Sequence, residues 1–202
     1  MTAVAFTFWG VSITWLELAG DLTGIVSVWL LTRRNIWNWP IGLLNTVLFS
    51  ILFVQSKLYG DAVLQLFFFA MGVWGWWSWV HSAGPTEAAP VRRTSKREWT
   101  LLALAAIVGT SFAVLYLSHF TDSPVPLADG SILVLSLCAT WGQVKKRLES
   151  WWIWIGVDVI SVPLYLNRKL YPTALLYFVF GCLCVVGLRR WRRSLQGDDR
   201  HR

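Results

Sequence analysis

One carboxylate stands near the middle of a long apolar segment and is the residue best placed to do chemistry. Asp158 is the only charged side chain in Trp151–Asn167. A carboxylate at that depth in a bilayer costs about 2.5–3.5 kcal/mol or more, so it is expected to face a cavity or a partner. Trp151, Trp154 and Asp158 are spaced i, i+3 and i+7, which places them on one helical face. Two indoles and an acid on one face predict a site for a flat cationic ring. The alternative is an interfacial Trp151 and an Asp158 that only bonds a neighbouring helix.

Amide and aromatic side chains in two other apolar segments are further candidates for binding a substrate. Asn45 lies at nearly the depth of Asp158, and Gln65 lies in the next segment, with Phe69 on its side and Trp76 further along. Buried amides also join neighbouring helices, typically for about 0.5–2 kcal/mol each. The sequence leaves both roles open for Asn45 and Gln65.

Other polar residues carry weaker signals. Glu17 and Asp21 lie one turn apart at the start of a helical segment, where the helix dipole favours acids, and an outer cation vestibule is the alternative. The three cysteines, Cys138, Cys182 and Cys184, lie in apolar segments and are interpreted as packing residues.

Motifs for enzymatic chemistry are missing from the sequence. It contains no His-Glu-x-x-His, no Gly-x-Ser-x-Gly and no phosphate-binding glycine loop. We therefore expect no catalytic residues, no metal site and no cofactor. No Arg or Lys lies near the centre of an expected span, which disfavours a phosphorylated substrate.

The elements that position these residues are membrane helices. The chain is 55% hydrophobic and 14% charged, against about 25% charged in soluble domains. Its apolar segments are long enough to cross a hydrocarbon core of about 30 Å as helices. The expected spans are 15–32, 36–56, 62–80, 99–118, 130–144, 151–167 and 170–188. The predicted fold is therefore an all-α integral membrane protein with seven transmembrane helices.

A direct internal repeat organises these helices. A shift of 112 residues places Leu58-Tyr59 on Leu170-Tyr171 and Arg33-Arg34 on Lys145-Lys146. Such a repeat predicts two parallel three-helix bundles joined by one connecting helix, with the substrate between the copies. The expected divisions are a first repeat at 1–80, a cytoplasmic linker at 81–97, a connecting helix at 98–119, a second repeat at 129–191 and a basic tail at 192–202.

The distribution of basic residues predicts the orientation. If the chain crosses the membrane seven times, successive loops lie on alternate sides. One side then carries only three basic residues, Lys57, Arg168 and Lys169, beside an acidic loop around Asp122, and the opposite side carries the other 15 Lys and Arg residues. Because cytoplasmic loops are enriched in Lys and Arg, the N-terminus is predicted outside and the C-terminus in the cytoplasm. Basic residues at helix ends also explain the net charge of +7 without a nucleic-acid partner.

Four groups of residues resemble the PnuC vitamin transporters, over about Trp15 to Trp191. They are Trp37-Asn38-Trp39-Pro40-Ile41-Gly42-x-x-Asn45, Leu58-Tyr59-x-Asp61-x-x-Leu64-Gln65, Gly75-Trp76-x-x-Trp79 and Trp151-x-x-Trp154-x-x-x-Asp158. The resemblance implies a bacterial inner-membrane protein for uptake of nicotinamide riboside, with sister groups for thiamine and riboflavin. It also implies facilitated diffusion with intracellular trapping by phosphorylation, and an architecture related to the SWEET sugar facilitators.

The resulting hypothesis is a facilitator for a small cationic vitamin or nucleoside, with nicotinamide riboside ahead of thiamine and uncharged riboflavin least favoured. Proton coupling through Asp158 stays open. The competing hypotheses are a SWEET-like sugar facilitator and, from a different class, an intramembrane enzyme or structural subunit. The sequence does not determine the oligomeric state, and a homo-oligomer is one option.

Overall fold

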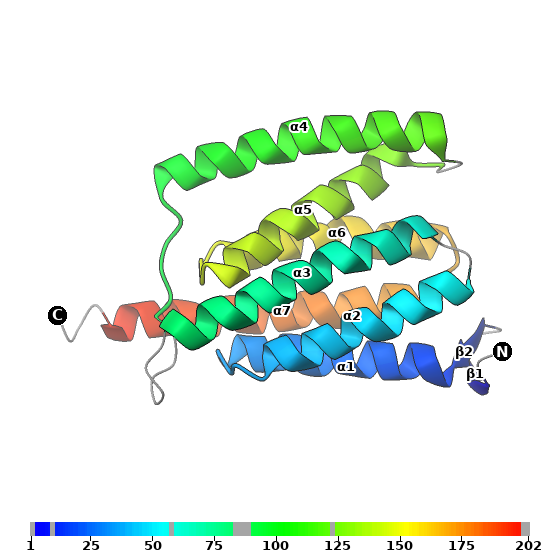
Figure 1. Ribbon diagram of the computed structural model, residues 1–202, viewed down its shortest axis with the longest axis horizontal. Coiled ribbons are helices and arrows are strands. Elements are labelled where there is room, and N and C mark those ends of the chain that lie inside the picture. The colour runs from blue at the N-terminus through cyan, green and yellow to red at the C-terminus, as the bar shows by residue number, and fades with distance from the viewer. Residues whose placement is uncertain (1–2, 9–10, 57–58, 83–89, 122–123, 199–202) are drawn as a thin grey trace. The chain divides into compact units, whose positions relative to one another are not determined.

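The computed structural model of this chain describes residues 3–8, 11–56, 59–82, 90–121 and 124–198. These residues form seven α-helices and one short hairpin (Figure 1). The all-α architecture, with three helices, a connecting helix and three more helices, confirms the predicted fold class. Several residues used above lie outside the described residues, namely Lys57, Leu58, Asp122, Arg200, Arg202 and 83–89 of the predicted linker.

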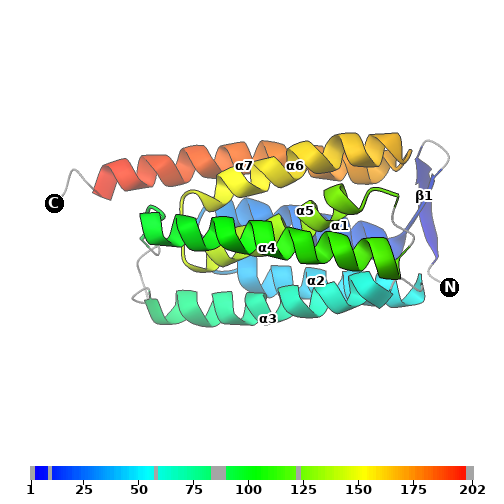
Figure 2. The same ribbon diagram turned by 90° about the horizontal axis from the view of Figure 1, so that it is seen from above.

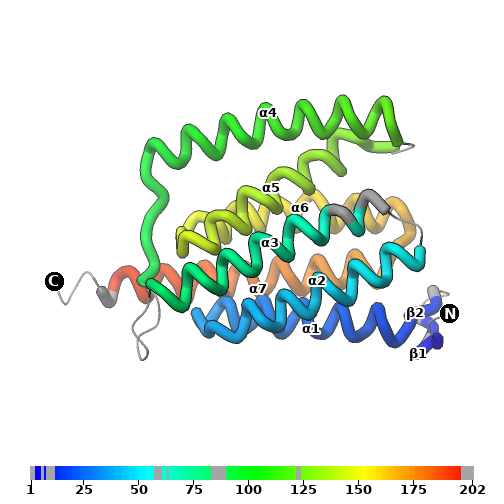
Figure 3. The backbone as a smooth tube through the Cα atoms, viewed as in Figure 1, coloured from blue at the N-terminus to red at the C-terminus, as the bar shows by residue number. Residues whose placement is uncertain are grey.

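The chain divides into two compact units at residues 89 and 90. The first unit begins with a β-hairpin of β1 (Val4–Phe8) and β2 (Val11–Thr14), and Thr14 then caps α1 by accepting a hydrogen bond from the Glu17 backbone N–H. Its helices are α1 (Trp15–Thr32), α2 (Asn38–Gln55) and α3 (Tyr59–Ser82). Helix α2 packs against both α1 and α3 (Figure 3).

The second unit contains α4 (Lys96–Phe120), α5 (Pro126–Val144), α6 (Ser150–Asn167) and α7 (Tyr171–Asp198). Helix α5 packs against α4 and α6, and α6 runs beside α7 (Figure 2). A capping box between Ser95 and Glu98 starts α4 two residues before the predicted connecting helix. Helix α7 continues seven residues beyond Trp191, so most of the predicted basic tail is helical.

The internal repeat is visible in the backbone of each unit. Helix α2 and helix α6 begin and end at positions that differ by 112 residues. The turn before each has one non-glycine residue with a positive φ, Arg34 at 57° and Lys146 at 56°, again 112 residues apart. Both residues donate their backbone N–H to a carbonyl three residues earlier. The two sequences therefore build the same helix–turn–helix geometry.

Tryptophan and glycine pairs set the packing of α2 on α3 in the first unit and of α6 on α7 in the second. Trp39 meets Trp79 edge to face at 5.5 Å between ring centroids, and Trp151 meets Trp191 in the same way at 5.4 Å. Such aromatic pairs contribute about 0.5–1.5 kcal/mol beyond area burial. A Cβ at Gly187 would lie 2.6 Å from the Trp151 ring. The close approach of these helices therefore requires glycine opposite the indole.

Five of the described helices are long and apolar enough to cross a membrane by length and composition: α1, α2, α4, α5 and α7. Their outer surfaces agree with that placement, because large apolar side chains such as Ile107, Phe112 and Leu115 on α4 are more than half exposed. In water such surfaces would be unfavourable, whereas a bilayer solvates them.

A strap joins the start of the second unit to the turn between α5 and α6. The backbone of Arg92 donates to the Lys146 carbonyl and accepts from the Leu148 N–H, both at 3.0 Å. Glu98 forms an ion pair with Arg147 at 2.5 Å. Within the second unit, these contacts attach the beginning of α4 and the segment before it to the turn between α5 and α6.

Candidate functional site

The candidate site lies about halfway along helix α6. At 1.5 Å per residue, Asp158 lies about 12 Å from the start of an 18-residue helix about 27 Å long. Trp154, Asp158 and Ser161 follow at i, i+4 and i+7 and therefore share one face, which we call the α6 polar face. It combines an indole N–H donor, a carboxylate and a hydroxyl.

Asp158 is held by the adjacent helix α7. Its side chain is only 4% exposed, and the Cys184 thiol of α7 lies beside its carboxylate. The backbone of α7 comes close at Gly181, where a Cβ would lie 3.5 Å from the Asp158 Cβ. That distance is an ordinary van der Waals contact, so α7 packs directly against Asp158 at this position.

Most of the buried side-chain polar atoms without partners lie on α6. Among the described residues, Oδ2 of Asp158, Oγ of Ser161 and Nε1 of Trp154 on the α6 polar face have no hydrogen-bond partner, and neither does Nε1 of Trp151 on the same helix; the other two such atoms are Nε1 of Trp39 and Nε of Arg147. Buried polar groups are almost always paired in proteins, and each exception calls for an explanation. A polar ligand that contacts this face would supply the missing partners.

Trp151 lies in a different environment from the other predicted residues of α6. Its side chain is fully buried, with its ring against Gly187 and edge to face with Trp191. Its counterpart in the first unit, Trp39, makes the same contacts with Gly75 and Trp79. The structure therefore gives Trp151 a packing role inside the second bundle.

Asn45 uses its side-chain amide inside the first unit. The NH2 group donates to the Gly20 carbonyl at 2.6 Å and to the Thr23 hydroxyl at 3.2 Å. Both acceptors belong to α1, so these bonds join α2 to α1, as the helix-joining alternative described.

Gln65, Phe69 and Trp76 share a face of α3 because they are spaced i, i+4 and i+11. Phe69 is 39% exposed, Trp76 is 41% exposed, and Gln65 is half-buried. Their counterparts on α7 at the 112-residue shift are Tyr177, Gly181 and Leu188. The Gly181 position, which touches Asp158, thus corresponds to Phe69.

One of the acids at the helix starts has an ion-pair partner. Asp129 near the start of α5 forms an ion pair with Arg168 at 2.9 Å. Its counterpart Glu17 lies in the first turn of α1, and Asp21 follows one turn later, half-buried. No group of three His, Cys, Asp or Glu side chains that could hold a metal ion occurs in the described part of the chain.

Sequence reasoning missed two residues of this region, Cys184 and Ser161. Cys184 was interpreted as a packing residue, yet its thiol lies beside the Asp158 carboxylate. Ser161 follows Asp158 by three residues, so extending the helical face by one turn would have found it. No sequence signal pairs Cys184 with Asp158, because they lie on different helices.

The fold and the polar mid-depth face define a multi-pass membrane transporter for a small molecule. A solved structure described as the vitamin B3 transporter PnuC is similar to this chain, with a TM-score of 0.75, 27% identity, and coverage of 90% of this chain and 82% of that one. The family model described as nicotinamide mononucleotide transporter matches residues 14–193. The chain belongs to this family of PnuC-type transporters, and it is a transporter rather than an enzyme.

Curated relatives cover nearly the whole chain. The nicotinamide riboside transporter PnuC of Escherichia coli (strain K12) is 27% identical over 210 residues, covering 92% of this chain and 88% of that protein. The PnuC of Neisseria mucosa is 28% identical over 195 residues, covering 91% and 74%. The riboflavin/roseoflavin transporter RibM of Streptomyces davaonensis is 29% identical over 206 residues, covering 99% and 95%. These relatives share transport of vitamins.

Proposed function

We propose that this protein carries nicotinamide riboside across the membrane by facilitated diffusion with alternating access. The observation that carries the proposal is the α6 polar face, with a buried carboxylate oxygen that has no partner among the described residues. Nicotinamide riboside has a flat pyridinium cation, which an indole face and a carboxylate both attract. Similarity to the relatives named nicotinamide riboside transporters supports the same substrate.

The absence of basic residues at mid-depth favours the riboside over a phosphorylated nucleotide. In the described helices, Arg and Lys occur only near helix ends, as in the first turn of α4 and the last part of α7. A phosphate at mid-depth would need a charge-assisted partner to offset its burial. We therefore propose that the substrate enters without phosphate and that phosphorylation in the cytoplasm traps it.

The site residues that we propose are Trp154 and Asp158 on α6 together with Gln65, Phe69 and Trp76 on α3. Asn45 and Trp151 were also predicted as site residues. For these two we propose supporting roles, because their described contacts lie within their own bundles. The basic loops favour an orientation with the N-terminus outside and the C-terminus in the cytoplasm.

Riboflavin is the second candidate substrate. The observation that favours it is the riboflavin transporter relative, which matches 99% of this chain. This similarity places riboflavin ahead of thiamine, although riboflavin is uncharged and was the least favoured of the three vitamins on the sequence alone. Thiamine, which is also cationic, is the third candidate, and a sugar the fourth.

The test measures uptake of labelled nicotinamide riboside, thiamine and riboflavin by the purified protein in liposomes. We expect nicotinamide riboside to equilibrate without accumulating, and an imposed pH gradient to leave its distribution unchanged. Hydrogen bonds to charged groups contribute about 1.5–3 kcal/mol, so Asp158→Asn should weaken binding about 10- to 100-fold. Asp61→Asn, which removes an exposed acid at the start of α3, serves as the matched control.

Each result selects among the candidates. Riboflavin uptake that is insensitive to Asp158→Asn would replace nicotinamide riboside with riboflavin. Accumulation driven by a pH gradient would overturn facilitated diffusion in favour of proton coupling. Transport of none of the three compounds would refute the vitamin proposal, and sugars would then be tested.

A further inference from the structure

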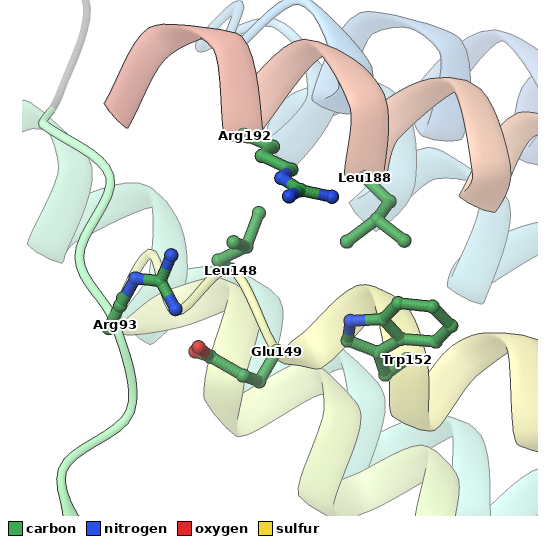
Figure 4. Close-up of a pocket in the computed structure, with 6 residues that line it drawn as sticks. All are labelled: Arg93, Leu148, Glu149, Trp152, Leu188 and Arg192. Atoms are coloured by element: carbon green, nitrogen blue, oxygen red, sulfur yellow. The ribbon is translucent and has the colours of Figure 1, made fainter. Parts of the chain in front are cut away.

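A small amphipathic pocket lies at one end of the second unit, away from the α6 polar face. Its volume is about 200 Å³. Its walls come from three places: the segment before α4, the start of α6 and the end of the apolar part of α7 (Figure 4). The lining residues are Arg93, Leu148, Glu149, Trp152, Leu188 and Arg192.

Two guanidinium groups give this pocket a positive end. Arg93 and Arg192 come from separate segments and are both exposed (Figure 4). Neither has an ion-pair partner among the described residues. The nearby Glu149 carboxylate is already engaged, since one of its oxygens accepts from the backbone N–H and the hydroxyl of Thr94 at 2.7 and 2.8 Å. The pocket can therefore offer two charged donor groups to an anion.

The opposite wall is apolar and lies at the depth of the lipid headgroups. Leu188 ends the uncharged segment 170–188, and arginines follow at once. The indole of Trp152 is 59% exposed in the first turn of α6 and faces the pocket with its nitrogen side (Figure 4). Tryptophan is enriched at this level of a membrane because its ring is apolar at one end and polar at the other.

We propose that this pocket binds the phosphate of an anionic phospholipid such as phosphatidylglycerol. Arg93 and Arg192 hold the phosphate, while Trp152 and Leu188 contact the glycerol and the upper acyl chain. The volume is below the roughly 300–1,000 Å³ of typical small-molecule sites, so it accommodates a phosphate and not a whole nucleoside. A soluble anion would gain nothing from the apolar wall, and this favours a lipid. The proposal does not depend on which vitamin is transported.

The test titrates the full chain, purified in neutral detergent, with phosphatidylglycerol and separately with phosphatidylcholine. Native mass spectrometry counts bound lipid, and thermal unfolding gives the apparent affinity. An Arg near a membrane surface contributes about 1 kcal/mol toward an anionic lipid, so Arg93→Gln with Arg192→Gln should weaken phosphatidylglycerol binding about 30-fold. Phosphatidylcholine binding should not change. If the double variant fails to fold, Arg192→Gln alone should weaken binding about fivefold.

The matched control also removes two positive charges, both from the end of α7 that carries Arg192. Arg189→Gln with Arg193→Gln alters two exposed arginines that do not line the pocket. We expect a change of at most a few-fold. Equal losses in both double variants would overturn the proposal in favour of diffuse attraction. The proposal also fails if inorganic phosphate gives the same stabilisation as the lipid, or if phosphatidylglycerol binds no better than phosphatidylcholine.

Discussion

Gly187→Ala tests whether helix packing in the second unit depends on a glycine opposite an indole. A Cβ at Gly187 would lie 2.6 Å from Cη2 and Cζ2 of Trp151 and 2.7 Å from Cε2. Carbon atoms prefer separations of about 3.5–4.0 Å, so three rigid ring atoms would be about 1 Å too close. The ring cannot move away easily, because Trp151 is fully buried and meets Trp191 edge to face.

The expected cost follows from two opposing effects. Overpacking a buried position costs about 1–3 kcal/mol, and the rigid ring places Gly187→Ala near the upper end. Replacing glycine by alanine inside a helix gains about 1 kcal/mol. The net destabilisation is therefore about 2 kcal/mol, and the midpoint of thermal unfolding should fall by about 4–8 °C for a chain of this size.

Gly156→Ala is the matched control, because it lies in α6 and a Cβ there meets nothing within 4 Å. Thermal unfolding of both variants in the same detergent, followed by circular dichroism, measures the difference. The control should match the wild-type midpoint or exceed it by about 2–4 °C. Equal midpoints for the two variants would show that the indole is free to move and would refute the packing argument.

Three further perturbations test other contacts. Asn45→Ala removes the two hydrogen bonds that the Asn45 amide donates to α1, and it should lower the free energy of unfolding by about 0.6–1.7 kcal/mol. No loss would show that these hydrogen bonds contribute nothing to stability. In a double-mutant cycle, Glu98→Gln and Arg147→Gln should show a coupling free energy of about 1 kcal/mol or less, which decreases with added salt. A coupling free energy that does not depend on salt would contradict a surface ion pair. Burial lowers the pKa of Lys146, so the unfolded chain holds its proton to higher pH than the folded chain. Stability should therefore rise as the pH approaches about 10.5 from below. Lys146→Asn, which tolerates the positive φ, should weaken this rise, and an unchanged slope would exclude Lys146 as its source.

The sequence alone determined the membrane class, the seven helices and the repeat. Bilayer thickness translates directly into segment length, so 15–32 was predicted with the observed bounds of α1. The 112-residue shift anticipated a shared local geometry, which appears as the paired positive φ values at Arg34 and Lys146. These features depend on local composition and spacing, which a sequence displays.

Only the tertiary structure decided which candidate side chains already make packing contacts or hydrogen bonds within their own bundle. Trp151 and Trp154 have the same residue type, lie one turn apart and each keep a buried N–H without a described partner, yet the Trp151 ring is fully buried against Gly187 and Trp191, whereas Trp154 is only half-buried. Asp158 meets Cys184 across two helices, a pairing that no sequence spacing reveals. The physical reason is that periodicity assigns a residue to a face of its own helix, whereas its partner depends on how the helices pack against each other.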